Sequence, residues 1–183
     1  MRIIGGEAKG RRLLFPGKSG ARPTSDMIKE SLFNILASLT DKSLLDVFAG
    51  AGNVGIEALS RGAAHVVFIE KEANLAEYIR KNILLCGFAD KHELLSMMME
   101  KAVPFLQRRG DRFDVIFADP PYEVGLVEET WKKLKSGILL TKEGVLVVQH
   151  SVREEPQWRQ EGELLLFEQR KYGDTLLSFL KHH

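Results

Sequence analysis

From residue 43 onward, short apolar runs alternate along the chain with amphipathic segments. The apolar runs have the length of buried strands, and the amphipathic segments carry apolar residues at helical spacing. This alternation is typical of right-handed βαβ units, which build a mostly parallel sheet with helices on both faces. The sequence therefore predicts an α/β fold. We expect strands at residues 44–49, 65–70, 92–97, 113–118 and 144–149, and helices near residues 53–61, 73–86, 99–108 and 125–135.

The two ends of the chain depart from this pattern. Near the C-terminal end, the apolar stretches 163–170 and 175–181 are separated by a short turn-like connection, which favours an antiparallel hairpin. Near the N-terminal end, residues 2–5 and 10–14 predict two short strands, followed by a loop rich in glycine and proline. We therefore expect a small β-hairpin appendage to precede the main sheet.

A helix is predicted directly after this appendage. Thr24, Ser25 and Asp26 offer N-cap chemistry, and apolar residues follow at helical spacing. The expected division is an N-terminal basic hairpin and loop at residues 1–23 and a main domain at residues 24–183.

Composition narrows the class of protein. A hydrophobic content of 44% in 183 residues is ample for one core. Cys86 is the only cysteine, so an intramolecular disulfide is excluded, and neither cysteine nor histidine spacing matches a metal-ligand pattern. The apolar runs are strand-sized, and the N-terminal residues lack the apolar core of a secretory signal. We expect a cytoplasmic monomer in a reducing compartment, without a metal and without membrane association.

The charge of the chain is unevenly placed. The whole chain has a net charge of +1, but its first thirty residues hold seven basic and three acidic residues and so carry +4. A local basic face of this kind can bind phosphates although the molecule is near neutral. The alternative is that these side chains are merely solvated on a flexible leader. The candidate phosphate contacts are Lys9, Arg11, Arg12 and Arg22.

The first predicted strand enters a glycine-rich stretch at residues 50–55. Glycines here let the backbone approach a ligand closely at a helix N-terminus, although the spacing alone also fits dinucleotide-binding folds and arises by chance. Asp46 lies inside the strand, where a carboxylate is costly, so it either faces the ligand or caps amides of the loop. Glu70 ends the second strand, where an acid can accept both ribose hydroxyls. The alternative for Glu70 is ordinary surface charge.

The predicted strand at residues 113–118 ends in Asp119, Pro120, Pro121 and Tyr122. An aromatic amine is a poor nucleophile because its lone pair is delocalised into the ring, and acceptors aimed at its N–H groups would recover that lone pair. The Asp119 carboxylate and the Pro120 carbonyl suit this role, since proline has no N–H and a fixed φ. Tyr122 can then stack on the base. The alternative is that the prolines only end the strand and begin a loop.

Together these residues make the chain resemble the S-adenosylmethionine-dependent methyltransferases with a Rossmann-like sheet, and among them the bacterial 16S ribosomal RNA guanine-N2 methyltransferases. The resemblance covers nearly the whole chain and is carried by motifs at residues 10–13, 22–26, 29–34, 45–52, 55–63 and 119–122. It implies S-adenosylmethionine as cofactor and a target base held by the last of these motifs. The cofactor contacts that it implies are Arg22, Thr24, Asp46, Phe48, Ala49, Gly50, Ala51, Gly52, Glu70, Lys71, Met98, Met99 and Asp119.

One stretch departs from the family's pattern. The family usually has an Asp near the adenine amino group after the third strand, and here that position is Met98, within residues 96–100. A thioether can pack on an adenine face but accepts hydrogen bonds only weakly. Adenine recognition would then depend on backbone groups or on Glu100. The alternative for the methionine run is plain core filling.

The resemblance implies methyl transfer from S-adenosylmethionine to the exocyclic N2 of a guanine in small-subunit ribosomal RNA, either free or in an assembled or assembling subunit. A DNA adenine-N6 methyltransferase could use the same Asp-Pro-Pro-Tyr sequence, but the chain has no room for a sizeable target-recognition domain. A nicotinamide-dependent oxidoreductase would explain the glycines and Glu70 but not Asp119. The third alternative is a non-catalytic RNA-binding assembly factor that retains a cofactor fold.

Overall fold

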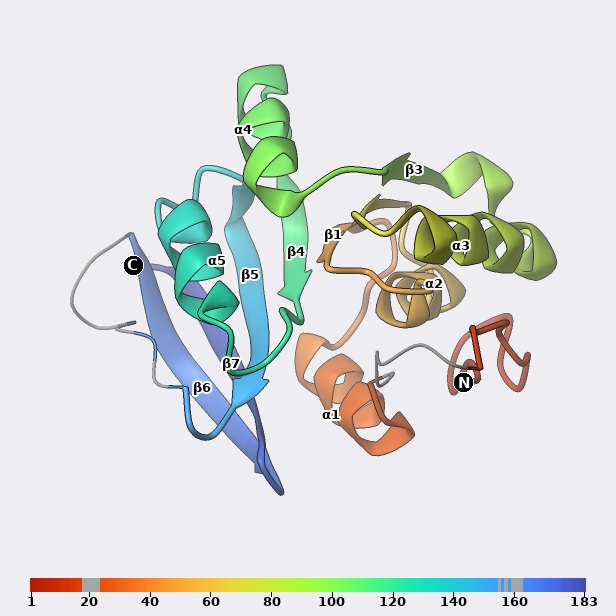
Figure 1. Cartoon of the computed structure of the whole chain (residues 1–183), viewed down its shortest axis with the longest axis horizontal. Coiled ribbons are helices and arrows are strands. Elements are labelled where there is room, and N and C mark those ends of the chain that lie inside the picture. Colours follow the sequence, from red (N-terminus) through yellow and green to blue (C-terminus); the bar gives the residue numbers. More distant parts are fainter. Residues whose placement is uncertain (18–23, 155, 157, 159–162) are drawn as a thin grey trace. The chain divides into compact units, whose positions relative to one another are not determined.

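The computed structural model describes residues 1–17, 24–154, 156, 158 and 163–183. The chain forms two compact units, Met1–Met98 and Met99–His183, and most of their helices and strands are labelled in Figure 1. Within the described residues, helices and strands alternate along the chain, and the last helix is followed by three successive strands. This order agrees with the alternation that the sequence predicts.

The first unit is built on three parallel strands. They lie in the order β3 (His92–Leu95), β2 (His65–Ile69) and β1 (Ser43–Val47), and Leu45 of β1 pairs with Val67 of β2. After their first residues, β1 and β2 are buried throughout, as expected for parallel strands that are covered on both faces. Their near-continuous apolar sequences reflect that burial.

The helices of the first unit begin and end at recognisable signals. The Ser25 hydroxyl accepts a hydrogen bond from the amide of Ile28 at 3.3 Å, so the predicted N-cap is confirmed. Gly87 ends the longest helix in the left-handed conformation that glycine adopts easily. The unit contains α1 (Asp26–Leu36), α2 (Asn53–Ser60), α3 (Ala73–Cys86) and the 3₁₀ turn η1 (Ala89–Lys91).

The N-terminal segment, residues 1–17, does not form the two strands predicted over residues 2–5 and 10–14. Its only β-bridge within the described residues joins Arg2 to Arg12 in antiparallel sense. The ladder does not extend further, because the amides of Ile4, Gly5, Glu7 and Ala8 bond to Glu57 and Ser60 of α2 instead. The prediction of two strands was therefore wrong in extent, although the chain does fold back on itself.

Helix α2 is buried along its whole length and anchors the N-terminal segment. The Glu57 carboxylate accepts hydrogen bonds from the amides of Ile4 at 2.9 Å and Gly5 at 2.8 Å. It also contacts Lys29 Nζ at 3.3 Å and Arg61 Nε at 2.8 Å. A buried carboxylate thus holds two backbone amides and two cations, which offsets the cost of removing it from water.

Gly6 lies almost against α2. A Cβ atom at this position would lie 1.7 Å from the carbonyl oxygen of Ser60, and the φ of Gly6 is +75°. Only glycine fits such an approach.

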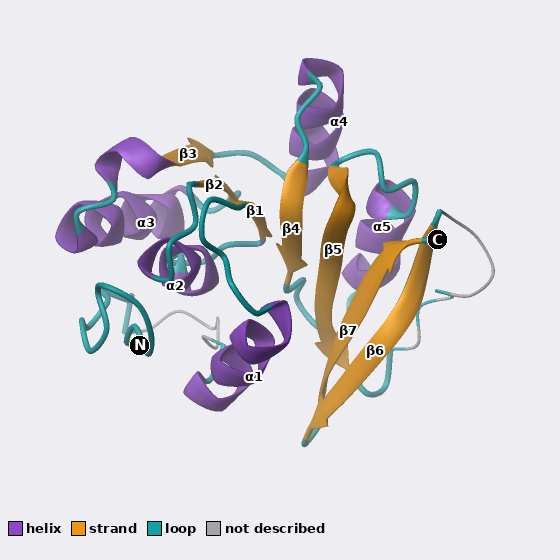
Figure 2. Cartoon of the chain, turned by 180° about the vertical axis from the view of Figure 1, so that it is seen from behind, coloured by secondary structure: helices purple, strands orange, loops and turns teal. Residues whose placement is uncertain are grey.

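The second unit contains four strands, in the order β4 (Phe113–Ala118), β5 (Leu140–Ser151), β7 (Thr175–His182) and β6 (Leu164–Tyr172) (Figure 2). Strands β4 and β5 are parallel, whereas β7 is antiparallel to both β5 and β6. The predicted C-terminal hairpin is confirmed. Strand β5 begins at Leu140 instead of residue 144, because it already pairs with the start of β4 before the register shifts.

Two helices, α4 (Met99–Arg109) and α5 (Leu126–Leu134), complete the second unit. Trp131 of α5 packs edge-on against Trp158, which in turn contacts the ring of His150 on β5. Burial lowers the pKa of His150.

The α/β class predicted from the sequence is confirmed, as is the change from parallel strands to an antiparallel hairpin. The domain boundary at residue 23 falls outside the described residues and stays a prediction. None of the described helices is long and apolar enough to cross a membrane.

Candidate functional site

The glycine turn, residues 48–52, connects β1 to α2 in the first unit. Its backbone is left-handed at Phe48 (φ 66°), Gly50 (φ 57°) and Gly52 (φ 85°). A Cβ atom on Gly52 would lie 2.9 Å from the Ile56 side chain, so this position favours glycine on two counts. For a bulky residue such as Phe48, a positive φ is uncommon and strained. Strain of this kind is concentrated at functional sites, and the turn is therefore a candidate ligand site.

Asp46 is a buried residue of β1 that caps the following helix. Its Oδ2 accepts a hydrogen bond from the amide of Gly55 at 2.8 Å, in the first turn of α2. Of the two roles that the sequence left open for Asp46, amide capping is confirmed. The capped amide and the turn glycines belong to the positively polarised end of the helix.

Glu70 directly follows β2, and its side chain bonds to the glycine turn. Its Oε2 accepts from the amide of Gly50 at 2.7 Å, and its Oε1 accepts from the amide of Glu72 at 2.8 Å. Burial raises the pKa of the Glu70 carboxyl, although these amide bonds act in the opposite direction. The ordinary surface role that was the alternative is excluded, because Glu70 is 7% exposed.

The structure brings most of the expected cofactor contacts of the first unit to this turn. Thr24 is tied to it through its carbonyl oxygen, which accepts from Asn53 Nδ2 at 2.9 Å. Arg22 lies outside the described residues. The expected contacts in or directly beside the turn and its two strands are Asp46, Phe48, Ala49, Gly50, Ala51, Gly52, Glu70 and Lys71.

The methionine run has two different environments. Met98 is 47% exposed, so core filling does not account for it. Met99 is 2% exposed and is the first residue of α4, in the second unit. Packing of Met98 on an adenine stays a prediction.

The proline corner, residues 119–122, follows β4 in the second unit. Asp119 is partly exposed and Pro120 is buried. The Tyr122 hydroxyl accepts a hydrogen bond from Gln149 Nε2 on β5 at 2.8 Å. Burial raises the pKa of Tyr122, and the charge of nearby Asp119 raises it further. The corner is therefore a structured element whose tyrosine is held at its polar end.

The residues after the corner are tied to the end of β5. Glu123 has a positive φ of 59°, and its amide donates to Glu154 Oε1 at 3.0 Å. Its carboxylate accepts from Arg153 Nη1 at 2.9 Å and from the Ser151 hydroxyl at 3.3 Å. Neither these residues nor Gln149 were predicted from the sequence. The one available signal was Gln149 itself, a polar residue that follows an apolar run.

The basic residues predicted to contact RNA phosphates differ in their own contacts within the protein. Lys9, Arg11 and Arg12 are exposed, but Arg11 Nη1 donates to the carbonyl oxygen of Leu85. Their contact with RNA stays a prediction.

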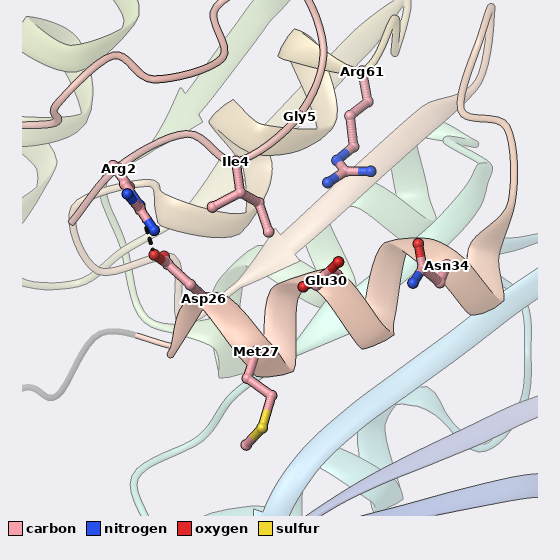
Figure 3. A pocket seen from close by; sticks show the side chains of 8 residues that line it. All are labelled: Arg2, Ile4, Gly5, Asp26, Met27, Glu30, Asn34 and Arg61. Atoms are coloured by element: carbon pink, nitrogen blue, oxygen red, sulfur yellow. Dashed lines mark hydrogen bonds and ion pairs between the residues drawn. The ribbon is translucent and has the colours of Figure 1, made fainter.

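An open cavity of about 460 Å³ lies between the N-terminal segment and α1 (Figure 3). Its cations are already paired with acids, since Arg2 Nε lies 2.8 Å from Asp26 Oδ2 and Arg61 Nε lies 2.8 Å from Glu57 Oε1. None of the residues that line it is an expected cofactor contact.

The part of the chain that matches known proteins includes both units. The family model described as conserved hypothetical protein 95 matches residues 1–181. The chain belongs to this family.

Members with a named activity are similar over most of the chain. The Escherichia coli (strain K12) protein named ribosomal RNA small subunit methyltransferase D is 38% identical over 153 residues, which cover 83% of this chain and 75% of the relative. The protein of the same name from Haemophilus influenzae is 39% identical over 134 residues, covering 70% of this chain and 67% of the relative. The family is thus one of ribosomal RNA methyltransferases.

Solved structures agree with the fold. A hypothetical protein from Thermus thermophilus matches with a TM-score of 0.85 and 30% identity, over 99% of each chain. An RNA methyltransferase from Salinibacter ruber, solved with S-adenosyl-L-homocysteine, matches with a TM-score of 0.65 and 18% identity, over 86% of this chain and 92% of that one. This chain thus has the Rossmann-like methyltransferase fold.

Proposed function

We propose that this protein transfers the methyl group of S-adenosylmethionine to the exocyclic N2 of a guanine in small-subunit ribosomal RNA. The observation that carries the proposal is the proline corner, which presents an aspartate, a proline carbonyl and an anchored tyrosine in a member of this family. We expect the protein to act as a cytoplasmic monomer.

The glycine turn fits the nucleoside half of the cofactor. The Glu70 carboxylate accepts the backbone amides of Gly50, Glu72 and Lys71, which leaves one of its about four lone pairs for a ribose hydroxyl. The strained turn supplies close backbone approach at the start of α2. When bound, S-adenosylmethionine supplies a methyl group on a positively charged sulfur.

The proline corner fits an aromatic amine. The Asp119 carboxylate and the Pro120 carbonyl accept the two N–H groups of the guanine amine, which recovers its lone pair for attack. The amine gains the methyl group and loses one proton, which Asp119 or a water molecule accepts. Tyr122 stacks on the base, and Gln149 keeps the tyrosine in place. Catalysis then consists of positioning and of stabilising positive charge on the nitrogen.

The target base has to leave its stack to reach the corner. Unstacking costs a few kcal/mol in a duplex and less in a loop or bulge. Structured RNA with exposed guanines is therefore the expected substrate, with phosphates held by Lys9, Arg11, Arg12 and Arg22.

The experiment is incubation of the protein with radiolabelled S-adenosylmethionine and small ribosomal subunits from a strain that lacks it, followed by nucleoside analysis. Parallel reactions with free 16S RNA and with DNA distinguish the substrate forms. We expect label in N2-methylguanosine of the RNA. Label in methyladenine of the DNA would favour the DNA methyltransferase, and no transfer would favour the assembly factor.

Asp119→Ala tests the role of the corner. Loss of this acceptor should reduce methyl transfer by about a hundredfold or more, as removal of a group that stabilises developing charge does, and should leave RNA affinity unchanged. Asp90→Ala, an exposed aspartate of η1, is the matched control and should behave as the native enzyme does. Full methylation by Asp119→Ala would refute the assigned role.

A further inference from the structure

Gln149 lies at the carboxyl end of β5, next to the proline corner. Strands β4 and β5 are parallel, and their ladder pairs Ala118 with Val148. Gln149 is the next residue of β5, and Asp119 is the first residue after β4. The charge of Asp119 acts on Tyr122, and Gln149 bonds to the hydroxyl of the same tyrosine, so both side chains lie near Tyr122.

The two polar atoms of the Gln149 side chain, Nε2 and Oε1, differ in their hydrogen bonding. Its Nε2 donates to the Tyr122 hydroxyl at 2.8 Å, and the Thr175 side chain bonds to the same hydroxyl. Its Oε1 is buried and has no hydrogen-bond partner among the described residues. The amide nitrogen thus has a structural task, and the carbonyl oxygen does not.

An unpaired buried acceptor is costly, so its presence in a folded protein needs a reason. Gln149 is only 5% exposed, so bulk water does not satisfy it. A partner that arrives with a ligand would satisfy Oε1 and would explain why a polar residue is kept at the end of an otherwise apolar stretch.

Guanine offers such a partner. Its edge carries the N2 amine directly beside the N1–H, so two adjacent acceptors on the protein match two adjacent donors on the base. Adenine has a lone pair at N1 beside its amine, and an acceptor opposite that lone pair would be repelled. Asp119 and Gln149 provide acceptors that both lie near Tyr122.

We propose that Gln149 Oε1 accepts the N1–H of the target guanine and so selects guanine over adenine, while its Nε2 holds Tyr122 in its stacking position. This inference rests on the proposed function, because it requires a guanine amine at the proline corner. It adds a residue outside the Asp-Pro-Pro-Tyr motif to base recognition.

The test compares two substrates that differ at N1 and at C6. Small subunits are reconstituted with RNA that carries either guanine or 2-aminopurine at the position labelled above. 2-Aminopurine keeps the exocyclic amine but has a lone pair at N1 and lacks the 6-oxo group, so the change in preference between native enzyme and variant reports on Gln149. The native enzyme should prefer guanine by about five- to a hundredfold in kcat/KM, the range expected for specific contacts to a base edge. In Gln149→Leu this preference should fall close to unity.

Loss of the Tyr122 hydrogen bond in Gln149→Leu affects both substrates alike, so it cancels in the ratio. Gln149→Glu keeps an acceptor and should keep the preference. Gln149→Met, which also lacks an acceptor, replaces Gln149→Leu if that variant unfolds. Gln169→Leu is the matched control, because Gln169 lies on β6 and bonds to Ser178.

Equal losses on both substrates in the leucine or methionine variant overturn the inference, since Gln149 would then act only through Tyr122. Loss of the preference in Gln149→Glu overturns it as well. If the native enzyme methylates neither substrate, the proposed function fails and this inference with it, an outcome distinct from the other two.

Discussion

At the scale of single residues, Glu70 shows how one carboxylate can serve both a loop and a ligand. Its two oxygens hold the amides of Gly50 and Glu72, so it shapes the glycine turn before any ligand arrives. Burial raises the pKa of this carboxyl above the usual value of 4.5. Donated hydrogen bonds from ribose hydroxyls would favour the ionised form and oppose that shift.

Cofactor affinity should therefore depend on the protonation of Glu70. Because burial raises the pKa of Glu70 in the free protein, the carboxyl takes up a proton at a higher pH than an ordinary glutamate does. Affinity for S-adenosylmethionine should fall about tenfold for each pH unit below the pKa. Isothermal titration at a series of pH values measures this dependence.

Glu70→Gln should bind about tenfold or more weakly at neutral pH, as loss of hydrogen bonds to a charged group does, and should show a flat pH dependence. Glu77→Gln, at an exposed glutamate of α3, is the control. Native affinity in Glu70→Gln would exclude a ribose contact.

At the scale of secondary structure elements, α2 is the centre of the first unit. Its N-terminus faces the glycine turn, and its buried Glu57 binds the N-terminal segment and Lys29 of α1. Burial lowers the pKa of Lys29, while the charge of Glu57 opposes that shift. The pair is fully buried, with 0% exposure of both side chains.

Breaking the Lys29–Glu57 ion pair should lower the free energy of unfolding substantially. Lys29→Met leaves Glu57 buried with fewer donors, and removal of one partner of a buried ion pair costs about 3–5 kcal/mol. Lys81→Met is the control, since the Lys81–Glu77 pair is about half exposed and is worth about 0–1 kcal/mol. Denaturant unfolding measures both free energies. Equal losses of unfolding free energy in the two variants would show that burial does not make the Lys29–Glu57 pair more important for stability than an exposed pair.

At the scale of the whole molecule, most helices and strands of the main sheet could be predicted, because the apolar pattern of each extends over several residues. The apolar stretches that became β1, β2 and β4 are of this kind. The N-terminal strands could not be predicted correctly, because the partner of their amides is Glu57, more than fifty residues away in sequence.

The same limit applies to the candidate site. The glycine turn and the proline corner are local motifs and were visible in the sequence. The support of Tyr122 by Gln149, 27 residues later, depends on the pairing of β4 with β5, which no local pattern reports. The sequence left two roles open for Asp46, facing the ligand or capping amides. Capping became evident only from the position of the Gly55 amide in the structure.

The uneven charge leads to a prediction about RNA binding. If Lys9 and Arg12 contact phosphates, the double variant Lys9→Gln/Arg12→Gln should bind RNA more weakly and with a shallower salt dependence. Each lost phosphate contact lowers the slope of log affinity against log salt by about 0.7–0.9. Filter binding at several salt concentrations measures the slope. An unchanged slope relative to the control Lys91→Gln/Lys142→Gln would exclude these contacts.

The docking of the N-terminal segment on α2 also has a consequence for biosynthesis. The amide of Ile4 bonds to Glu57, a residue 53 positions later in the chain. At about 5–20 residues per second, the ribosome adds that many residues in roughly 3–10 s. The N-terminal segment is therefore made several seconds before its acceptor, and a nascent chain stalled before α2 would leave this segment open to proteases.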